Sequence, residues 1–277
     1  MKNIVLQGKH QKPILLDTFY TENKIKKPIV IFCHGYKGFK DWGAWDLMAK
    51  TFADAGFFFV KFNFSHNGGT VDNPIDFPDL EAFGNNNYTK ELDDLESVID
   101  WCLTENTLED EMDLDSIFLV GHSRAGGIVT IKAAEDDRVK KVISLAGVSD
   151  YKRRTATTGD LEEWKRNGIK YVTNSRTKQE MPHFYQFYEN FIENEERLTI
   201  QRAVDSLKVP YLIIHGDEDD AISVDEAYAL NKWNPESKLA IIEGANHVFG
   251  AKHPWNEKEM PFHLEKATSL CVDFFQD

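Results

Sequence analysis

The sequence predicts an α/β fold in which a mainly parallel, twisted sheet carries helices on both faces. Short apolar runs alternate along the chain with segments whose apolar residues recur at helical spacing. The runs are continuous, as in Ile29-Val30-Ile31-Phe32, which is typical of strands that are covered on both sides. Strands that alternate with helices in this way are joined by right-handed crossovers and therefore run parallel.

Each element can be placed in order along the chain. The strands are expected at residues 3–7, 14–20, 28–33, 57–64, 117–120, 139–148, 210–215 and 238–243. The helices are expected at about residues 45–55, 92–102, 128–134, 224–233 and 264–274. Residues 70–87 have no clean period and are rich in Pro, Asp and Asn, which predicts a long and therefore functional or mobile loop.

An insertion at about residues 151–208 interrupts this alternation within what we expect to be a single domain, residues 1–277. A helix is expected at 160–166, a hairpin between 169 and the residues after Thr177, and an aromatic segment at 183–192. Because the insertion leaves and rejoins one edge of the sheet, it could cap a site there. The aromatic side chains of Phe184, Tyr185, Phe187, Tyr188 and Phe191 either pack this cap onto the body or bind an acyl or aryl group.

Composition and charge exclude several classes of protein. The chain has 277 residues, of which 42% are hydrophobic, as in a soluble globular protein. Its 32 basic and 46 acidic residues give a net charge of −14, which argues against a nucleic-acid or anionic-membrane partner. No apolar stretch is long enough for a secretory signal or a membrane span. The cysteines, Cys33, Cys102 and Cys271, lie in separate apolar segments, so we expect free thiols in a reducing compartment, the cytoplasm.

Residues 116–127, Ser-Ile-Phe-Leu-Val-Gly-His-Ser-Arg-Ala-Gly-Gly, are the most informative stretch. A strand ends at Gly121, a helix resumes by Ile128, and Ser123 stands between them among small residues. Such a turn would expose the serine hydroxyl at the edge of the sheet, in front of a helix N-terminus. We therefore interpret Ser123 as a nucleophile.

The turn has two other possible interpretations. Serine is a favoured helix cap, so Ser123 could have no more than that role. The spacing of Gly121 and Gly126 also matches part of a phosphate-binding loop. That motif continues with lysine and a hydroxyl residue, whereas Gly127 and Ile128 follow here, so the phosphate-loop interpretation fails.

A serine needs a base that is itself oriented by a third group. Candidates follow the two last strands: the acidic run Asp217-Glu218-Asp219-Asp220 follows one, and Gly244-Ala245-Asn246-His247 follows the other. Their order along the chain, serine, acid and histidine, is that of the α/β-hydrolase triad.

The sequence thus resembles a serine hydrolase of the α/β-hydrolase superfamily, from about residue 14 to the C-terminus. Gly121-His122-Ser123-Arg124-Ala125-Gly126 is similar to the nucleophile elbow, with Ala125 in place of the second glycine. His34-Gly35-Tyr36-Lys37-Gly38 resembles the oxyanion loop, and Gly244 to His247 resembles the segment that supplies the base. His215-Gly216…Asp219…Ile222 resembles the segment that supplies the acid; this assigns Asp219, with Asp217 or Asp220 as alternatives.

The resemblance implies acyl transfer in which His247 activates Ser123, Asp219 orients His247, and the backbone N–H groups of Tyr36 and Arg124 bind the oxyanion. No cofactor is implied, and no metal is expected because the sequence has neither an H-E-x-x-H motif nor a Cys/His cluster. His34 and His215 are expected to have structural roles.

The expected function is hydrolysis of small acyl or aryl carboxylic esters, and the cap loosely resembles that of bacterial cinnamoyl and feruloyl esterases. The alternatives are a peptidase of the prolyl-oligopeptidase or acylaminoacyl type, a thioesterase, and a homologue that binds a ligand without catalysis. Such peptidases usually carry a large N-terminal propeller, for which this chain has no room. The partner would be a small-molecule ester, and the oligomeric state cannot be predicted from this sequence.

Overall fold

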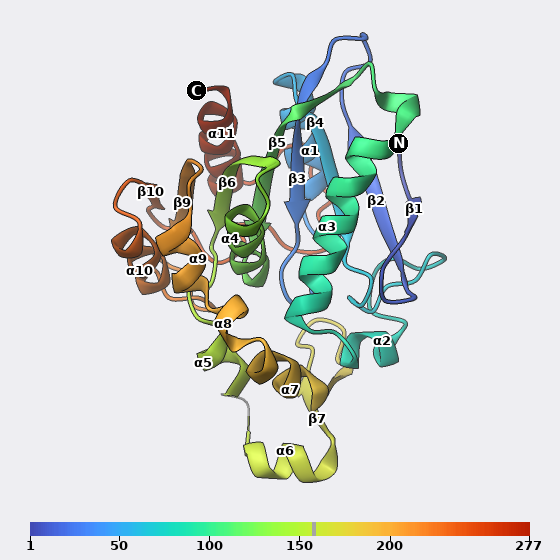
Figure 1. Cartoon of the computed structure of the whole chain (residues 1–277), viewed down its shortest axis with the longest axis vertical. Coiled ribbons are helices and arrows are strands. Elements are labelled where there is room, and N and C mark those ends of the chain that lie inside the picture. The colour runs from blue at the N-terminus through green and yellow to red at the C-terminus, as the bar shows by residue number, and fades with distance from the viewer. Residues whose placement is uncertain (157–158) are drawn as a thin grey trace.

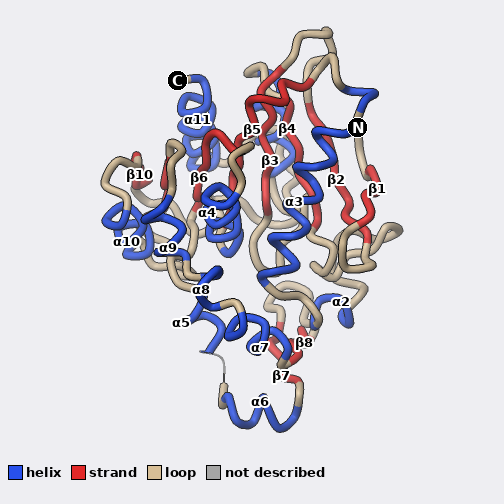
Figure 2. Tube along the Cα trace, in the orientation of Figure 1, coloured by secondary structure: helices blue, strands red, loops and turns tan. Residues whose placement is uncertain are grey.

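A computed structural model describes residues 1–156 and 159–277, and its central feature is an eight-stranded sheet (Figures 1 and 2). The strand order is β1-β2-β4-β3-β5-β6-β9-β10. The strands are β1 (Ile4–Gln7), β2 (Pro13–Phe19), β3 (Lys27–Cys33), β4 (Phe58–Asn63), β5 (Met112–His122), β6 (Val139–Leu145), β9 (Tyr211–Gly216) and β10 (Lys238–Ile242).

The strands from β4 to β10 are parallel, whereas β2 is antiparallel to both β1 and β4. The carboxyl ends of β5, β9 and β10 therefore lie at one edge of the sheet. The predicted α/β-hydrolase fold, with its mainly parallel sheet, is confirmed.

Helices cover both faces of the sheet. On one face, α3 (Tyr88–Thr104), α4 (Arg124–Glu135), α9 (Ile200–Ser206) and α10 (Asp225–Trp233) share a hydrophobic core with the strands. On the other face, α1 (Trp45–Asp54) and α11 (Phe262–Gln276) pack onto alternate residues of the same strands. The two cores follow from the strand geometry, because successive side chains point to opposite faces.

Residues 151–208, which we call the insert, lie between β6 and β9, and all of the insert except α9 lies in the lower part of the molecule in Figure 1. They contain α5 (Tyr151–Ala156), α6 (Leu161–Asn167), the hairpin of β7 (Ile169–Thr173) and β8 (Glu180–Phe184), α7 (Gln186–Glu193), α8 (Glu195–Leu198) and α9. The expected helix at 160–166 and the expected hairpin are both present. The aromatic segment is divided between β8 and α7.

Some boundaries differ from the predicted ones. The segment at 139–148 leaves the sheet after Leu145 because Ala146 takes a positive φ of 47°. The loop at 70–87 contains a short helix, α2 (Leu80–Gly84), which Asp79 caps by accepting a hydrogen bond from Ala82 N–H. A 3₁₀ turn, Asn106–Leu108, connects α3 to β5. Among the helices of the described residues, none combines the length and the apolar character that a membrane span requires.

Candidate active site

Ser123 occupies a sharp turn between β5 and α4. Its backbone angles, φ 58° and ψ −121°, lie in a region that non-glycine residues rarely adopt. The turn fits because small residues surround it: a Cβ atom on Gly126 would lie 2.6 Å from Ser144 Oγ and 2.8 Å from Gly147 Cα. Ser123 N–H donates to Leu145 O on β6 at 2.9 Å, which fixes the turn to the sheet. The serine is thus held in a strained conformation by its surroundings.

The structure brings Ser123, His247 and Asp219 into one hydrogen-bonded chain. His247 Nε2 lies 3.0 Å from Ser123 Oγ, and His247 Nδ1 lies 2.8 Å from Asp219 Oδ2. With the proton on Nδ1, the imidazole donates to the carboxylate and its Nε2 accepts from the hydroxyl. This is the geometry that a serine nucleophile and its base require.

Asp219 is buried and held by several donors. Its Oδ1 accepts from the backbone N–H groups of Ala221 at 2.9 Å and Ile222 at 2.8 Å. Its Oδ2 also lies 3.2 Å from His215 Nε2. Burial alone would raise the pKa of Asp219, but its hydrogen bonds with His215, His247 and Ile222 hold the pKa well below the ordinary value. The carboxylate is therefore ionised wherever His247 can act as a base.

The two alternative acids lie elsewhere. Asp217 is exposed, and its Oδ1 accepts from Gly244 N–H at 2.7 Å, which ties the two strand-end loops together. Asp220 is also exposed. Of the acidic run, Asp219 is the residue that the structure places on His247.

The loop after β3 lies directly against Ser123. A Cβ atom on Gly35 would be 2.8 Å from Ser123 Cβ and 3.3 Å from its Oγ, so glycine allows this close approach. His34 supports the loop from behind: its Nδ1 donates to Gly35 O at 2.9 Å and its Nε2 accepts from Phe64 N–H at 3.3 Å. Burial lowers the pKa of His34 to about 4, so the ring is neutral near pH 7.

Tyr36 and Arg124, the residues expected to supply the oxyanion hole, both line the cavity beside Ser123. Within the described part of the chain, the backbone N–H groups of these two residues have no protein acceptor. The other strand-end histidines fasten loops: His215 Nε2 donates to Ile222 O at 2.8 Å, and His122 Nε2 donates to His247 O at 2.9 Å. His122 thereby holds the backbone of the residue that carries the imidazole.

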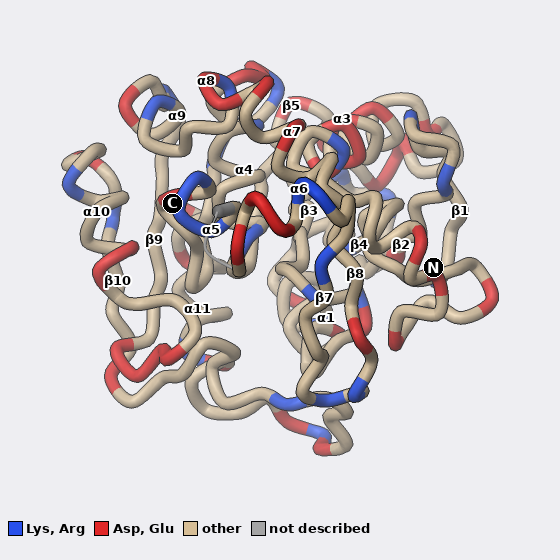
Figure 3. The backbone as a smooth tube through the Cα atoms, turned by 90° about the horizontal axis from the view of Figure 1, so that it is seen from below, with Lys and Arg blue, Asp and Glu red and all other residues tan. Residues whose placement is uncertain are grey.

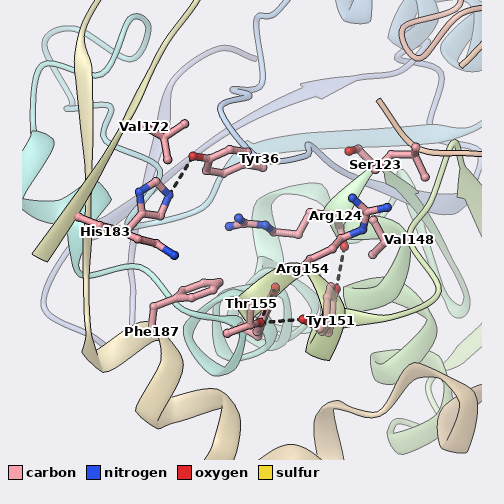
Figure 4. A pocket seen from close by; sticks show the side chains of 13 residues that line it. Tyr36, Ser123, Arg124, Val148, Tyr151, Arg154, Thr155, Val172, His183 and Phe187 are labelled. Carbon is pink, nitrogen blue, oxygen red and sulfur yellow. Dashed lines mark hydrogen bonds between the residues drawn. The ribbon is translucent and has the colours of Figure 1, made fainter. Parts of the chain in front are cut away.

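A cavity of about 240 Å³ opens beside Ser123 (Figure 4). More than half of its described lining comes from the insert, including residues that the sequence did not single out. These are Tyr151, Arg154, Thr155, Lys170, Val172 and His183. Tyr36 Oη lies 2.8 Å from His183 Nε2 and thus connects the loop after β3 to the insert. No periodicity or motif in the sequence identifies these residues, because they come together only through the tertiary position of the insert against the sheet.

The aromatic segment of the insert serves mainly in packing. The Phe187 ring lies 4.8 Å from the Tyr88 ring of α3, and Phe191 is buried in the same core. Tyr185 and Tyr188 pack around Trp164 of α6. Phe187 also lines the cavity.

One group of carboxylates elsewhere has the spacing of a metal site. Oxygen atoms of Asp17, Asp41 and Asp46 lie within 4.8 Å of one another. Lysine ammonium groups already neutralise the group: Lys40 Nζ is 2.9 Å from Asp17, and Lys61 Nζ is 2.6 Å from Asp46. These contacts make a partly buried ion-pair network that joins β2, β4 and α1.

Fold and site together define an α/β-hydrolase with a Ser–His–Asp arrangement at the carboxyl edge of its sheet. Within this class, the chain belongs to the prolyl oligopeptidase family, whose family model matches residues 44–268.

The wider comparisons agree with this class. Est1E from Butyrivibrio proteoclasticus, in a structure with ferulic acid bound, has a TM-score of 0.74 at 19% identity and matches over 99% of this chain and 98% of its own. An acylaminoacyl peptidase from Pyrococcus horikoshii has a TM-score of 0.67 at 19% identity, over 99% of this chain and 41% of its own. An uncharacterized 31.7 kDa protein of Escherichia coli is 30% identical over 145 residues, which is 52% of this chain and 45% of that protein.

Proposed function

We propose that this protein is a serine hydrolase that cleaves carboxylic esters of small acyl or aryl groups through an acyl-enzyme intermediate. The observation that carries the proposal is the hydrogen-bonded chain from Ser123 through His247 to Asp219, which opens on a cavity. The family match supports a serine hydrolase, and the likeness in fold to Est1E, which binds ferulic acid, supports an ester as its substrate.

In the proposed mechanism, His247 Nε2 takes the proton of Ser123 as the oxygen attacks the ester carbonyl. Asp219 keeps the other proton on Nδ1 and stabilises the imidazolium that forms. His247 then gives its proton to the leaving alcohol, and a water molecule, activated by the same imidazole, hydrolyses the acyl-enzyme.

The tetrahedral intermediate places negative charge on the former carbonyl oxygen. The free backbone N–H groups of Tyr36 and Arg124 are its proposed donors, and the strained turn at Ser123 positions the second of them. Losing one such donor typically costs about 3 kcal/mol of transition-state stabilisation.

We further propose that residues 151–208 act as the cap of a single-domain enzyme. The insert supplies one wall of the cavity, and Tyr151 Oη donates to Arg124 O at 2.7 Å, which joins the cap to the turn after the nucleophile. The partner would then be a small ester that fits between cap and sheet, in line with the expectation that neither nucleic acid nor membrane is bound.

A peptidase is the second candidate, and the family match is the observation that favours it. The same triad would also serve a thioesterase. A panel of acyl esters, aryl esters, acyl thioesters and an aminoacyl amide separates these possibilities by kcat/KM. The proposal predicts the highest kcat/KM on an oxygen ester, with no hydrolysis of any substrate by Ser123→Ala. A higher kcat/KM on the amide would instead favour the peptidase.

We infer a reducing compartment, the cytoplasm, as the place of action. Cys33, Cys102 and Cys271 are all buried and unpaired with one another, as expected for thiols that have no disulfide to form. Fractionation of the producing cell, with an antibody against this chain, would test this location.

A further inference from the structure

The cavity beside Ser123 has an unusual charge. Among the described residues that line it, Arg124, Arg154 and Lys170 are basic and none is Asp or Glu. The whole chain, by contrast, has a net charge of −14. The three cations come from separate elements, α4, α5 and β7, and line the same cavity. Figure 4 shows two of them, Arg124 and Arg154. Figure 3, which views the molecule from the side of the insert, shows the basic run Lys152-Arg153-Arg154 on α5.

Arg124 is the cation nearest to the nucleophile in sequence, and its side chain is enclosed by rings. Its guanidinium carbon lies 4.3 Å from the centre of the Tyr36 ring and 5.4 Å from that of Phe187. The nearest carboxylate oxygen, on Glu91, is 3.6 Å away and outside the cavity lining. At 3.6 Å the ion pair between Arg124 and Glu91 is longer than a charge-assisted hydrogen bond. The rings orient the guanidinium, and Glu91 balances its charge across this longer distance.

Arg154 faces the same cavity from the insert. Its Nη2 donates to Glu226 Oε1 at 2.7 Å, but its Nε is buried and has no hydrogen-bond partner in the described part of the chain. Glu226 is shared, because Arg153 Nη2 also donates to Oε1 at 2.8 Å and Ser149 donates to Oε2. One carboxylate thus faces two guanidinium groups, so this part of the wall also keeps an excess of positive charge.

The remaining ionisable groups do not cancel this charge. Burial lowers the pKa of His183 to about 3, and it raises the pKa of Tyr36 to about 12, so both side chains are neutral near pH 7. Lys170 also belongs to the cavity lining, and its Nζ lies 3.5 Å from the centre of the Trp164 ring. An anionic group that entered here would meet cations and aromatic rings, because Glu91 and Glu226, the carboxylates paired with the two arginines, are outside the described lining of this cavity.

We propose that this cavity selects esters that carry a carboxylate, which Arg124 and Arg154 bind by charge-assisted hydrogen bonds. This inference rests on the proposed esterase function and narrows its substrate class. Arginine suits the role because its planar fork matches a carboxylate and its charge is less strongly hydrated than that of lysine. The carboxylate could belong either to the acyl part or to the alcohol part of the ester.

Two pairs of substrates test the inference and show whether the carboxylate belongs to the acyl part or to the alcohol part of the ester. In the first pair the acyl part carries either a carboxylate, in methyl hemiglutarate, or a carboxamide, in methyl glutaramate. In the second pair the alcohol part carries either a carboxylate, in acetoxybutyrate, or a carboxamide, in acetoxybutyramide. We expect kcat/KM to favour the carboxylate by about tenfold or more in one pair. In Arg124→Gln and in Arg154→Gln this preference falls towards one, whereas Arg124→Lys retains part of it.

Arg153→Gln is the matched control. Arg153 shares Glu226 with Arg154, but its side chain is 63% exposed and is not part of the cavity lining. We expect this variant to keep the preference of the wild type. Thermal denaturation of each variant shows whether the fold is intact.

Two results would overturn the inference while leaving the esterase proposal in place. One is that the wild type cleaves the carboxamide at least as well as the carboxylate in both pairs. The other is that both glutamine variants keep the full preference. If none of these esters is cleaved and a fluorophosphonate leaves Ser123 unlabelled, the esterase proposal fails, and the inference fails with it.

Discussion

At the scale of single residues, the acid of the proposed triad shows what hydrogen bonding adds to sequence order. Four acidic residues follow one another at 217–220, and the sequence assigns Asp219 by its position after His215-Gly216, with Asp217 or Asp220 as alternatives. The structure separates Asp219 because its two oxygens face His247, His215 and two backbone N–H groups. Asp217 instead bonds to Gly244 and is exposed.

Replacing Asp219 by Asn should lower kcat/KM for an ester by about 10⁴-fold, because the amide favours the wrong tautomer of His247. Asp217→Asn is the control and should lose less than about tenfold, because its contact is to the backbone of a loop. Steady-state kinetics on both variants decide the assignment. Equal losses would contradict it.

Gly35→Ala should damage activity more than stability. The added methyl group would lie 2.8 Å from Ser123 Cβ, so the nucleophile or the oxyanion loop must move. A displacement of about 1 Å at a reacting atom can cost about 100-fold in rate. We expect kcat to fall by about that factor while the folded fraction at 25 °C, followed by circular dichroism, stays that of the wild type. An unchanged kcat would show that this close approach does not position the serine.

At the scale of elements, the sequence predicts the strands best. Runs such as Ile29 to Cys33 are apolar at every position and lie at the centre of the sheet, where both faces are buried. The short helices α2, α5 and α8 were not predicted, since each is too short to show a helical period. For α9 a signal was present: Ile200, Ala203 and Val204 are spaced for one helix face and are buried.

Glu226 links two elements, since α10 holds the start of the insert through it. Its Oε2 accepts from both Ser149 N–H and Ser149 Oγ at 2.6 Å, and its Oε1 accepts from the arginines of α5. Glu226→Gln should lower the free energy of unfolding by about 1–3 kcal/mol, because a buried set of charge-assisted bonds is broken.

Glu195→Gln provides the control for this prediction. Glu195 pairs with Lys152 of α5 at 2.7 Å, but both side chains are exposed. Its loss should change stability by less than about 0.5 kcal/mol. Urea denaturation of the two variants makes the comparison, and a larger effect at Glu195 would refute the anchoring role of Glu226.

At the scale of the whole molecule, the sequence predicts the fold class and the order of the proposed triad, but not the cavity. The carboxyl ends of parallel strands lie at the same edge of a sheet. The sequence therefore predicts that Ser123, Asp219 and His247 lie close together. The walls of the cavity depend on where the insert lies over that edge of the sheet. No local sequence pattern at Arg154, Lys170 or His183 predicts the position of the insert. The overall composition, which is acidic, therefore does not predict the basic lining of the cavity.

The dependence of the free energy of unfolding on pH is a second property of the whole molecule. We expect Asp94 to make the largest contribution to it between about pH 4 and pH 7. Burial raises the pKa of Asp94 from 3.8 to about 7, although the N–H of Ser65 donates to its Oδ2. Between about pH 4 and pH 7 the unfolded chain has lost a proton that folded Asp94 keeps. Stability therefore decreases as pH rises through this range, by up to about 4 kcal/mol.

Asp94→Asn removes this titration. The gain in free energy of unfolding over the wild type should grow from about pH 4 to pH 7 and then level off. Urea denaturation at several pH values measures it, with the exposed Asp115→Asn as a control that should change stability by less than about 0.5 kcal/mol throughout. A gain for Asp94→Asn that is the same at every pH would contradict a raised pKa.

The central claim is that Ser123 is a nucleophile activated by His247, and covalent labelling tests it most directly. The native protein is treated with a fluorophosphonate, and the modified residue is identified by peptide mass spectrometry. We predict stoichiometric labelling at Ser123, none in Ser123→Ala, and labelling slowed by orders of magnitude in His247→Ala. A folded wild-type protein that remains unlabelled, or that carries the label on another residue, would contradict the claim.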